Sequence, residues 1–184
     1  MTPEQREQIL QALWPQDAKS KLSVWAILDC ARDPKIYLAL LESRLEFRCL
    51  YSGTIPRALE MNAPQLVELL PDHRLTLRLL DEGWGKAWGL FLTTDDAARL
   101  REHLRRWLKV RDDAGRRYLF RFYDPRVLPA WLKSATPAQL ARFFGPIQRI
   151  VTEVSRGRSL WEYRLEQGQL VELQLELPSA LGSG

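Results

Sequence analysis

The sequence predicts an α/β domain: a mixed sheet with flanking helices, followed by a smaller C-terminal lobe made of one helix and a β-hairpin. Short apolar runs alternate with amphipathic segments through the first two-thirds of the chain, as expected where strands alternate with helices in a layered domain. Apolar and polar residues then alternate on both sides of Gln167-Gly168, the pattern of a hairpin. With 184 residues, 46% of them hydrophobic, the chain can bury a core, and we expect a division between residues 1–134 and 135–184.

Capping signals locate the helices. Thr2-Pro3-Glu4-Gln5 and Thr136-Pro137-Ala138-Gln139 each place a threonine before a proline and a glutamine at the third helical position, which is a capping box. Gly145-Pro146 marks the end of the second of these helices. The expected helices begin at Pro3, Pro34, Pro71, Thr94, Pro125 and Pro137.

Short apolar and β-branched runs locate the strands, and polar or glycine-containing turns separate them. Asp112–Gly115 is expected to be a turn between two short strands, and residues 178–184 are expected to be loose. The remaining strands are expected at residues 22–28, 46–50, 64–69, 88–92, 161–166 and 171–177.

The net charge of +4 comes from one segment. Between Asp95 and Arg126 ten Lys/Arg stand against six Asp/Glu, and the rest of the chain is balanced. The first twenty residues lack the basic start and apolar run of a signal peptide, and no apolar stretch approaches membrane-spanning length. We therefore expect a cytoplasmic protein with a basic surface patch and no membrane contact.

No motif in the chain points firmly to catalysis. Residues 83–89 (GWGKAWG) suggest a phosphate loop, but a helix precedes and a strand follows, whereas phosphate binding needs the loop to open a helix. A tight helix-to-strand turn wedged by two tryptophans is the competing interpretation. Cys30 and Cys49 are interpreted as inert small hydrophobic residues, and His73 and His103 as solvated. We expect no metal and no cofactor.

Asp124 stands out among the carboxylates. It lies in an aromatic and charged segment, residues 121–126 (RFYDPR), whose arginines could clamp it through bidentate bonds. Capping of a helix at Pro125 is the simpler interpretation. A hydrolase or transferase that uses Asp124 as an acid would need a partner group that the sequence does not reveal.

Three segments together resemble a known family. They are residues 83–91 (GWGKAWGLF), 119–128 (LFRFYDPRVL) and 136–146 (TPAQLARFFGP), and residues 26–37 (AILDCARDPKIY) and 46–53 (EFRCLYSG) fit the same pattern. The family is that of the effector chaperones, or adaptors, of bacterial type VI secretion, built on a domain long labelled only as of unknown function. The resemblance spans roughly residues 24 to 150 and fades after Gly145.

The resemblance implies a protein without catalysis. Members of the family bind a cognate toxic effector in the cytoplasm and help to load it onto the VgrG spike. Because Trp, Tyr and Arg contribute most at protein interfaces, the motif residues are candidates for the binding surface. The candidate protein-binding residues are Trp84, Trp88, Arg121, Tyr123, Asp124, Arg126, Phe143 and Phe144.

Two alternatives stay open at this stage. Residues 121–126 could lock a helix to the sheet instead of touching cargo, in which case the cargo surface could be the lobe after Gly145. The chain could also bind nucleic acid through the basic Asp95–Arg126 segment, although Asp95, Asp96, Glu102, Asp112 and Asp113 interrupt it.

Overall fold

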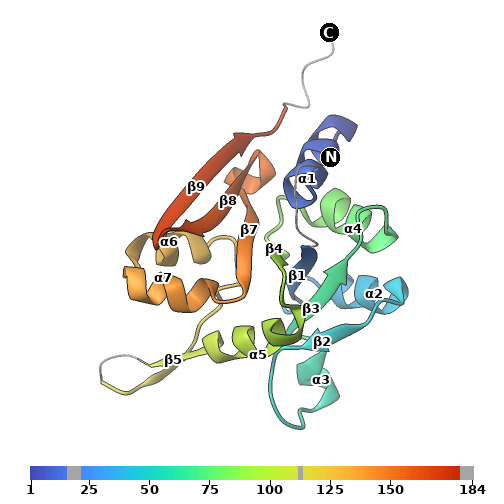
Figure 1. Cartoon of the computed structure of the whole chain (residues 1–184). Coiled ribbons are helices and arrows are strands. Elements are labelled where there is room, and N and C mark those ends of the chain that lie inside the picture. The colour runs from blue at the N-terminus through green and yellow to red at the C-terminus, as the bar shows by residue number, and fades with distance from the viewer. Residues whose placement is uncertain (16–21, 112–113, 179–184) are drawn as a thin grey trace.

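The computed structural model describes residues 1–15, 22–111 and 114–178. Its main feature is a seven-stranded sheet with the strand order β2-β3-β1-β4-β7-β8-β9, and β5 and β6 form a separate two-stranded hairpin (Figure 1). The strands are β1 Ser23–Asp29, β2 Phe47–Cys49, β3 Pro64–Leu69, β4 Gly89–Thr94, β5 Lys109–Arg111, β6 Arg117–Leu119, β7 Ile147–Val154, β8 Ser159–Glu166 and β9 Gln169–Glu176.

Seven α-helices are found in the described part of the chain. Both predicted capping boxes are confirmed, at Thr2 and Thr136. The helix expected to begin at Pro71 begins instead at Arg74, capped by His73, and continues as a π-helical turn, Leu79–Gly83. The α-helices are α1 Pro3–Leu13, α2 Pro34–Ser43, α3 Arg57–Glu60, α4 Arg74–Arg78, α5 Ala97–Trp107, α6 Leu128–Ser134 and α7 Pro137–Phe144.

The sheet is antiparallel throughout, so the expectation of a mixed sheet is wrong. The reason lies in how the strands interleave. The connection from β1 through α2 to β2 skips one position in the sheet, which β3 fills in the opposite direction. The connection from β3 through α4 to β4 likewise passes over β1. Strands β1 to β4 with α2 and α4 thus have the β-α-β-β-α-β order of a split, ferredoxin-like unit.

Helices cover both faces of the sheet, giving three layers. Because side chains alternate along a strand, Val24, Ala26 and Leu28 of β1 pack with α1, α2 and α4, whereas Ile27 packs on the opposite face with α5, α6 and α7. Figure 1 shows these two groups of helices on opposite sides of the sheet. The burial of both faces explains why the strands at the centre of the sheet are almost uninterrupted apolar runs.

The C-terminal hairpin was expected in a lobe of its own, but it is continuous with the sheet. Strand β7, which the sequence analysis did not predict, pairs with β4 on one side and with β8 on the other. The hairpin itself is confirmed, with Glu166 opposite Gln169, and Gln167 and Gly168 both have positive φ, as a type I′ turn requires. Whether the chain divides at residue 134 stays a prediction.

Two other expectations concern segments that the structure describes only in part. The turn at Asp112–Gly115 is flanked by β5 and β6 as expected, but Asp112 and Asp113 lie outside the described residues. Residues 178–184 were expected to be loose, and of these residues 179–184 also lie outside the described residues. None of the described helices is long and apolar enough to span a membrane.

Tyr163 of β8 offers a first test of the core. Its side chain is fully buried and stacks on Trp161, yet its hydroxyl has no hydrogen-bond partner among the described residues. Because burying an unpaired hydroxyl costs free energy, Tyr163→Phe is expected to leave the free energy of unfolding unchanged or to raise it by about 1 kcal/mol. Urea denaturation of both proteins measures this. A loss of more than about 1 kcal/mol would show that the hydroxyl has a partner.

Candidate protein-binding site

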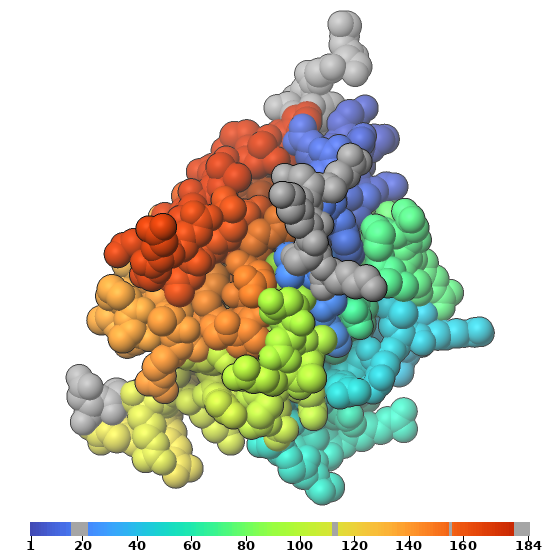
Figure 2. Space-filling model, in the orientation of Figure 1, coloured from blue at the N-terminus to red at the C-terminus, as the bar shows by residue number. Residues whose placement is uncertain are grey.

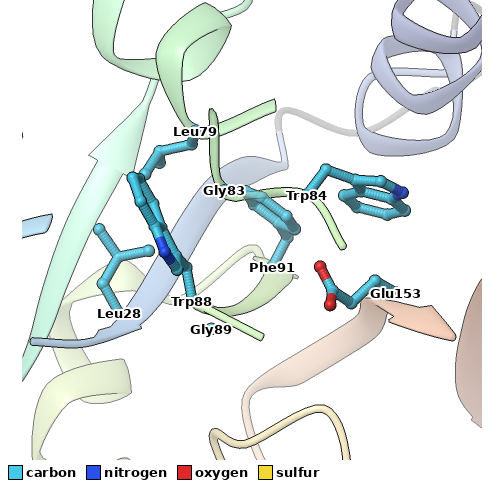
Figure 3. Close-up of a pocket in the computed structure, with 8 residues that line it drawn as sticks. All are labelled: Leu28, Leu79, Gly83, Trp84, Trp88, Gly89, Phe91 and Glu153. Atoms are coloured by element: carbon cyan, nitrogen blue, oxygen red, sulfur yellow. The ribbon is translucent and has the colours of Figure 1, made fainter. Parts of the chain in front are cut away.

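Glu153 of β7 fastens the glycine-rich loop that leads into β4. Its carboxylate accepts two backbone N–H bonds, from Gly85 at 2.6 Å and from Ala87 at 2.8 Å. The indole N–H of Trp84 donates to the carbonyl of Gly157 at 3.0 Å, just after the end of β7. Figure 3 shows the carboxylate directed toward the loop. The buried carboxylate therefore attaches residues 83–89 to β7, and the indole attaches them to the turn that follows β7, more than sixty residues later in the chain.

Two glycines of this loop are needed for close approach to other backbone. Gly85 has φ +87°, and a Cβ there would lie 2.8 Å from the carbonyl oxygen of Arg156. A Cβ on Gly89 would lie 2.0 Å from the carbonyl oxygen of Ile27 on the neighbouring strand. The cavity beside the loop holds only about 10 Å³, room for no more than about one water molecule. The prediction of a tight helix-to-strand turn is therefore confirmed, and the glycines serve packing.

The two tryptophans of the loop differ in exposure. Trp88 is 3% exposed and packs in the core, with the ammonium of Lys86 5.8 Å from its ring centre. Trp84 is half-buried and stacks on Phe91 at 6.2 Å between ring centres. Of the two, only Trp84 presents part of its side chain to solvent.

Arg126 clamps Asp124, as the sequence suggested. The Nε of Arg126 donates to Asp124 Oδ1 at 2.8 Å, its Nη2 donates to Oδ2, and its backbone N–H adds a third bond to Oδ1 at 2.9 Å. Burial alone would raise the pKa of the Asp124 carboxyl, but these bonds outweigh burial and hold its pKa below the ordinary value of 3.8. The side chain of Asp124 thereby closes a turn over residues 124–126, and α6 begins at Leu128, later than expected, with Val127 and not Asp124 at its N-cap.

Arg121 takes a different partner. Its guanidinium lies 4.0 Å from the carboxylate of Asp29, the last residue of β1, which is 3% exposed. Burial raises the pKa of Asp29, and the charge of Arg121 opposes that rise. Asp29, Asp124 and Glu153 thus form a cluster of three buried carboxylates at one end of the central strands, with the guanidinium side chains of Arg121 and Arg126 more than half exposed around it.

Two members of this carboxylate cluster, Asp124 and Glu153, have the features of a structural lock. Both oxygens of Asp124 accept hydrogen bonds from Arg126, and both oxygens of Glu153 accept hydrogen bonds from loop backbone. A general acid at neutral pH needs a raised pKa, whereas that of Asp124 is lowered. No three His, Cys, Asp or Glu of the described residues are grouped to hold a metal ion.

The eight candidate binding residues divide by burial. Arg121 and Arg126 are exposed and Trp84 is half-buried, and all three lie around the carboxylate cluster. The other five, each at most 3% exposed, pack inside the protein, and their part in binding stays a prediction: Trp88, Tyr123, Asp124, Phe143 and Phe144.

The histidines and cysteines are also placed. His103 was expected to be solvated, but it is half-buried on α5, and its Nε2 lies 2.7 Å from the carbonyl oxygen of Phe143; burial lowers its pKa. His73 caps α4 by accepting the N–H of Leu75. Burial raises the thiol pKa of both Cys30 and Cys49, which disfavours the reactive thiolate.

The Asp124–Arg126 clamp makes a pH-dependent prediction. Because the folded pKa of Asp124 lies below its unfolded value, its contribution to stability is complete above the unfolded value and is lost as pH falls through the folded pKa. We expect Asp124→Asn to lower the free energy of unfolding by about 2 kcal/mol at pH 7. The difference between the unmodified protein and the variant should be smaller at about pH 3. Urea titrations of both proteins at the two pH values measure it. A gap that does not change with pH would contradict the clamp.

Fold and site together define the class of domain: a three-layer α/β domain whose motif residues hold loops at one end of an antiparallel sheet. The family model described as "Domain of unknown function (DUF4123)" matches residues 24–142. Because that match covers more than half of the chain, the protein belongs to the DUF4123 family. The searches of curated proteins and of solved structures each gave no match.

Proposed function

We propose that this protein is a non-enzymatic chaperone or adaptor that binds a cognate type VI secretion effector in the cytoplasm and helps to load it onto the VgrG spike. The observation that carries the proposal is family membership together with the motif segments. Residues 83–91 and 119–128, which resemble the type VI adaptors, both lie inside the matched segment 24–142. In the structure these two segments form the loop that Glu153 holds and the turn in which Arg126 binds Asp124, so they contribute to the fold that presents the binding surface.

Surface features of the described residues support a binding role. Several large apolar side chains are exposed on separate elements: Leu38 and Leu41 on α2, and Leu173 and Leu175 on β9. Strand β9 is an edge strand eight residues long, so one row of its backbone groups is unpaired within the sheet. Strand edges of this kind are where partner proteins commonly add to a fold.

A tagged pull-down tests the proposal directly. The protein is co-expressed with the toxin encoded beside it, the lysate is treated with nuclease, and bound proteins are identified by mass spectrometry. We expect one large effector to co-purify, with or without VgrG, and its secretion to fall when the gene is deleted. Absence of co-purification together with unchanged secretion would refute the proposal.

The alternative is nucleic-acid binding through the Asp95–Arg126 segment. In the structure two cations of α5 are already engaged: Arg101 donates to the carbonyl of Cys49, and Arg105 lies 3.6 Å from the carboxylate of Glu102. The alternative predicts binding that weakens steeply with salt and is abolished by Arg105→Glu with Arg106→Glu. Flat binding curves at low salt would remove it.

A further inference from the structure

A groove runs between the β5–β6 hairpin and the last two α-helices. The C-terminal part of α5 and strand β5 form one side of it, and α6 and α7 form the other. In Figure 2 the hairpin (yellow) projects from the body of the protein beside the orange surface of the α7 region. The groove encloses about 660 Å³ and is lined by His103, Arg106, Trp107, Lys109, Val110, Arg111, Phe120, Trp131, Gln139 and Arg142.

The charged residues of the groove have one sign. Arg106, Lys109, Arg111 and Arg142 are all exposed, and no carboxylate is among the described lining residues. The Nε of Arg106 lies 3.9 Å from a carboxylate oxygen of Glu102, one turn earlier on α5, and Glu102 is not among the described lining residues. Low dielectric walls concentrate the field of such a cluster, so the groove attracts negative charge.

The floor of the groove is aromatic and firmly packed. The ring of Trp107 packs edge-to-face with those of Trp131 and Phe143, with 5.5 Å and 5.1 Å between ring centres. The ring centre of Phe120 lies 5.3 Å from that of Trp131. Trp107, Trp131 and Phe120 are each partly exposed above the buried ring of Phe143. Partly exposed aromatic rings on a rigid base are typical anchor points at protein interfaces.

We propose that this groove binds an extended acidic segment of the partner protein. Carboxylates of the segment pair with Arg106 and Arg142 on the two sides, and an apolar side chain of the segment rests on Trp107 and Trp131. The inference rests on the proposed function for the identity of the partner, which is the effector. A peptide fits better than a nucleic acid, because the ring planes of Trp107, Trp131 and Phe120 are steeply inclined to one another, at 68° and 51°, and offer no row of parallel faces on which successive bases could stack.

A peptide probe tests the groove without the effector. Fluorescence anisotropy is measured with a labelled peptide of Glu, Ser and Leu, with the same peptide carrying Gln for each Glu, and with a single-stranded oligonucleotide of equal length. We expect the acidic peptide to bind about tenfold or more tightly than its Gln counterpart, and the double variant Arg106→Glu/Arg142→Glu to abolish the difference. Arg106→Gln/Arg142→Gln serves as a milder pair if the reversal disturbs folding.

A matched control removes the same charge elsewhere. Lys35→Glu/Arg74→Glu changes two exposed cations on α2 and α4, which cover the opposite face of the sheet, and is expected to bind the acidic peptide like the unmodified protein. Equal binding of the two peptides, or equal loss in the control pair, would overturn the inference. Tighter binding of the oligonucleotide, lost in the groove variant, would overturn it in favour of nucleic acid.

Co-purification of the effector with the groove variant Arg106→Glu/Arg142→Glu distinguishes the groove inference from the proposed function. If the effector co-purifies equally well with the unmodified protein and with the groove variant, the groove inference fails and the proposed function stands. If no effector co-purifies even with the unmodified protein, the proposed function fails, and the peptide measurements still decide whether the groove selects acidic chains.

Discussion

Replacing Glu153 with alanine is expected to lower the free energy of unfolding by about 2–4 kcal/mol, because it leaves one buried and one partly buried backbone N–H group without an acceptor. Those groups belong to Gly85 and Ala87, in the loop that leads into β4. Urea denaturation followed by tryptophan fluorescence measures the change. Glu166→Ala, which removes an exposed carboxylate from β8, is the matched control and is expected to change stability by no more than about 0.5 kcal/mol. Equal effects of the two substitutions would contradict the role assigned to Glu153.

The same carboxylate is expected to make the free energy of unfolding depend on pH. Burial raises the pKa of Glu153 above the ordinary value of 4.5, and the N–H bonds from Ala87 and Gly85 only partly oppose it. A raised folded pKa means that the contribution of the group is full below the unfolded value and declines as pH rises through the folded value. The gap between the unmodified protein and Glu153→Ala should therefore be larger at about pH 5 than at about pH 8. A gap that grows with pH would refute the assignment.

Phe143→Ala is expected to cost about 3–5 kcal/mol, the range for truncating a fully buried aromatic side chain. The ring is 1% exposed and lies within 6.1 Å of four other aromatic rings, those of Trp107, Phe122, Trp131 and Phe144. Removing it opens a cavity beneath the floor of the basic groove. Thermal and urea unfolding measure the loss.

Two further variants make the Phe143 result interpretable. Phe143→Leu keeps most of the volume and is expected to cost about 1 kcal/mol, so it remains measurable if the alanine variant does not fold. Leu41→Ala removes a half-exposed side chain from α2 and is expected to have little effect. If Phe143→Ala weakened partner binding at unchanged stability, Phe143 would be a contact residue and its assignment to the core would be wrong.

The sequence was informative where local chemistry decides the structure. Capping boxes at Thr2 and Thr136 and the turn at Gln167-Gly168 depend on neighbouring residues, and all three predictions are confirmed. Strand direction depends instead on which strands interleave. The alternation of strands and helices suits both a parallel sheet and this split antiparallel one, so the pattern could not separate them.

The site shows the same division. The wedged turn at residues 83–89 and the clamp of Asp124 by Arg126 could be predicted because their parts are close in sequence. Glu153 was missed because its partners lie 66 and 68 residues away. The one available signal was a charged residue within a β-branched run, Val151-Thr152-Glu153-Val154, where a side chain facing the interior needs a partner.

The strand order also determines when each strand can pair during synthesis of the chain. Strand β1 leaves the ribosome before both of its neighbours, β3 and β4, and β4 must in turn wait for its second neighbour, β7. Pairings between such distant segments close slowly, typically within milliseconds to seconds, whereas the β8–β9 hairpin can form within about microseconds once it is made. Until residue 153 has been synthesised, the loop at residues 83–89 lacks its fastening and the edge of β4 is open. The nascent protein therefore completes its sheet only after β7 to β9 have been synthesised, and until then the unpaired edge of β4 is a site where premature association can begin.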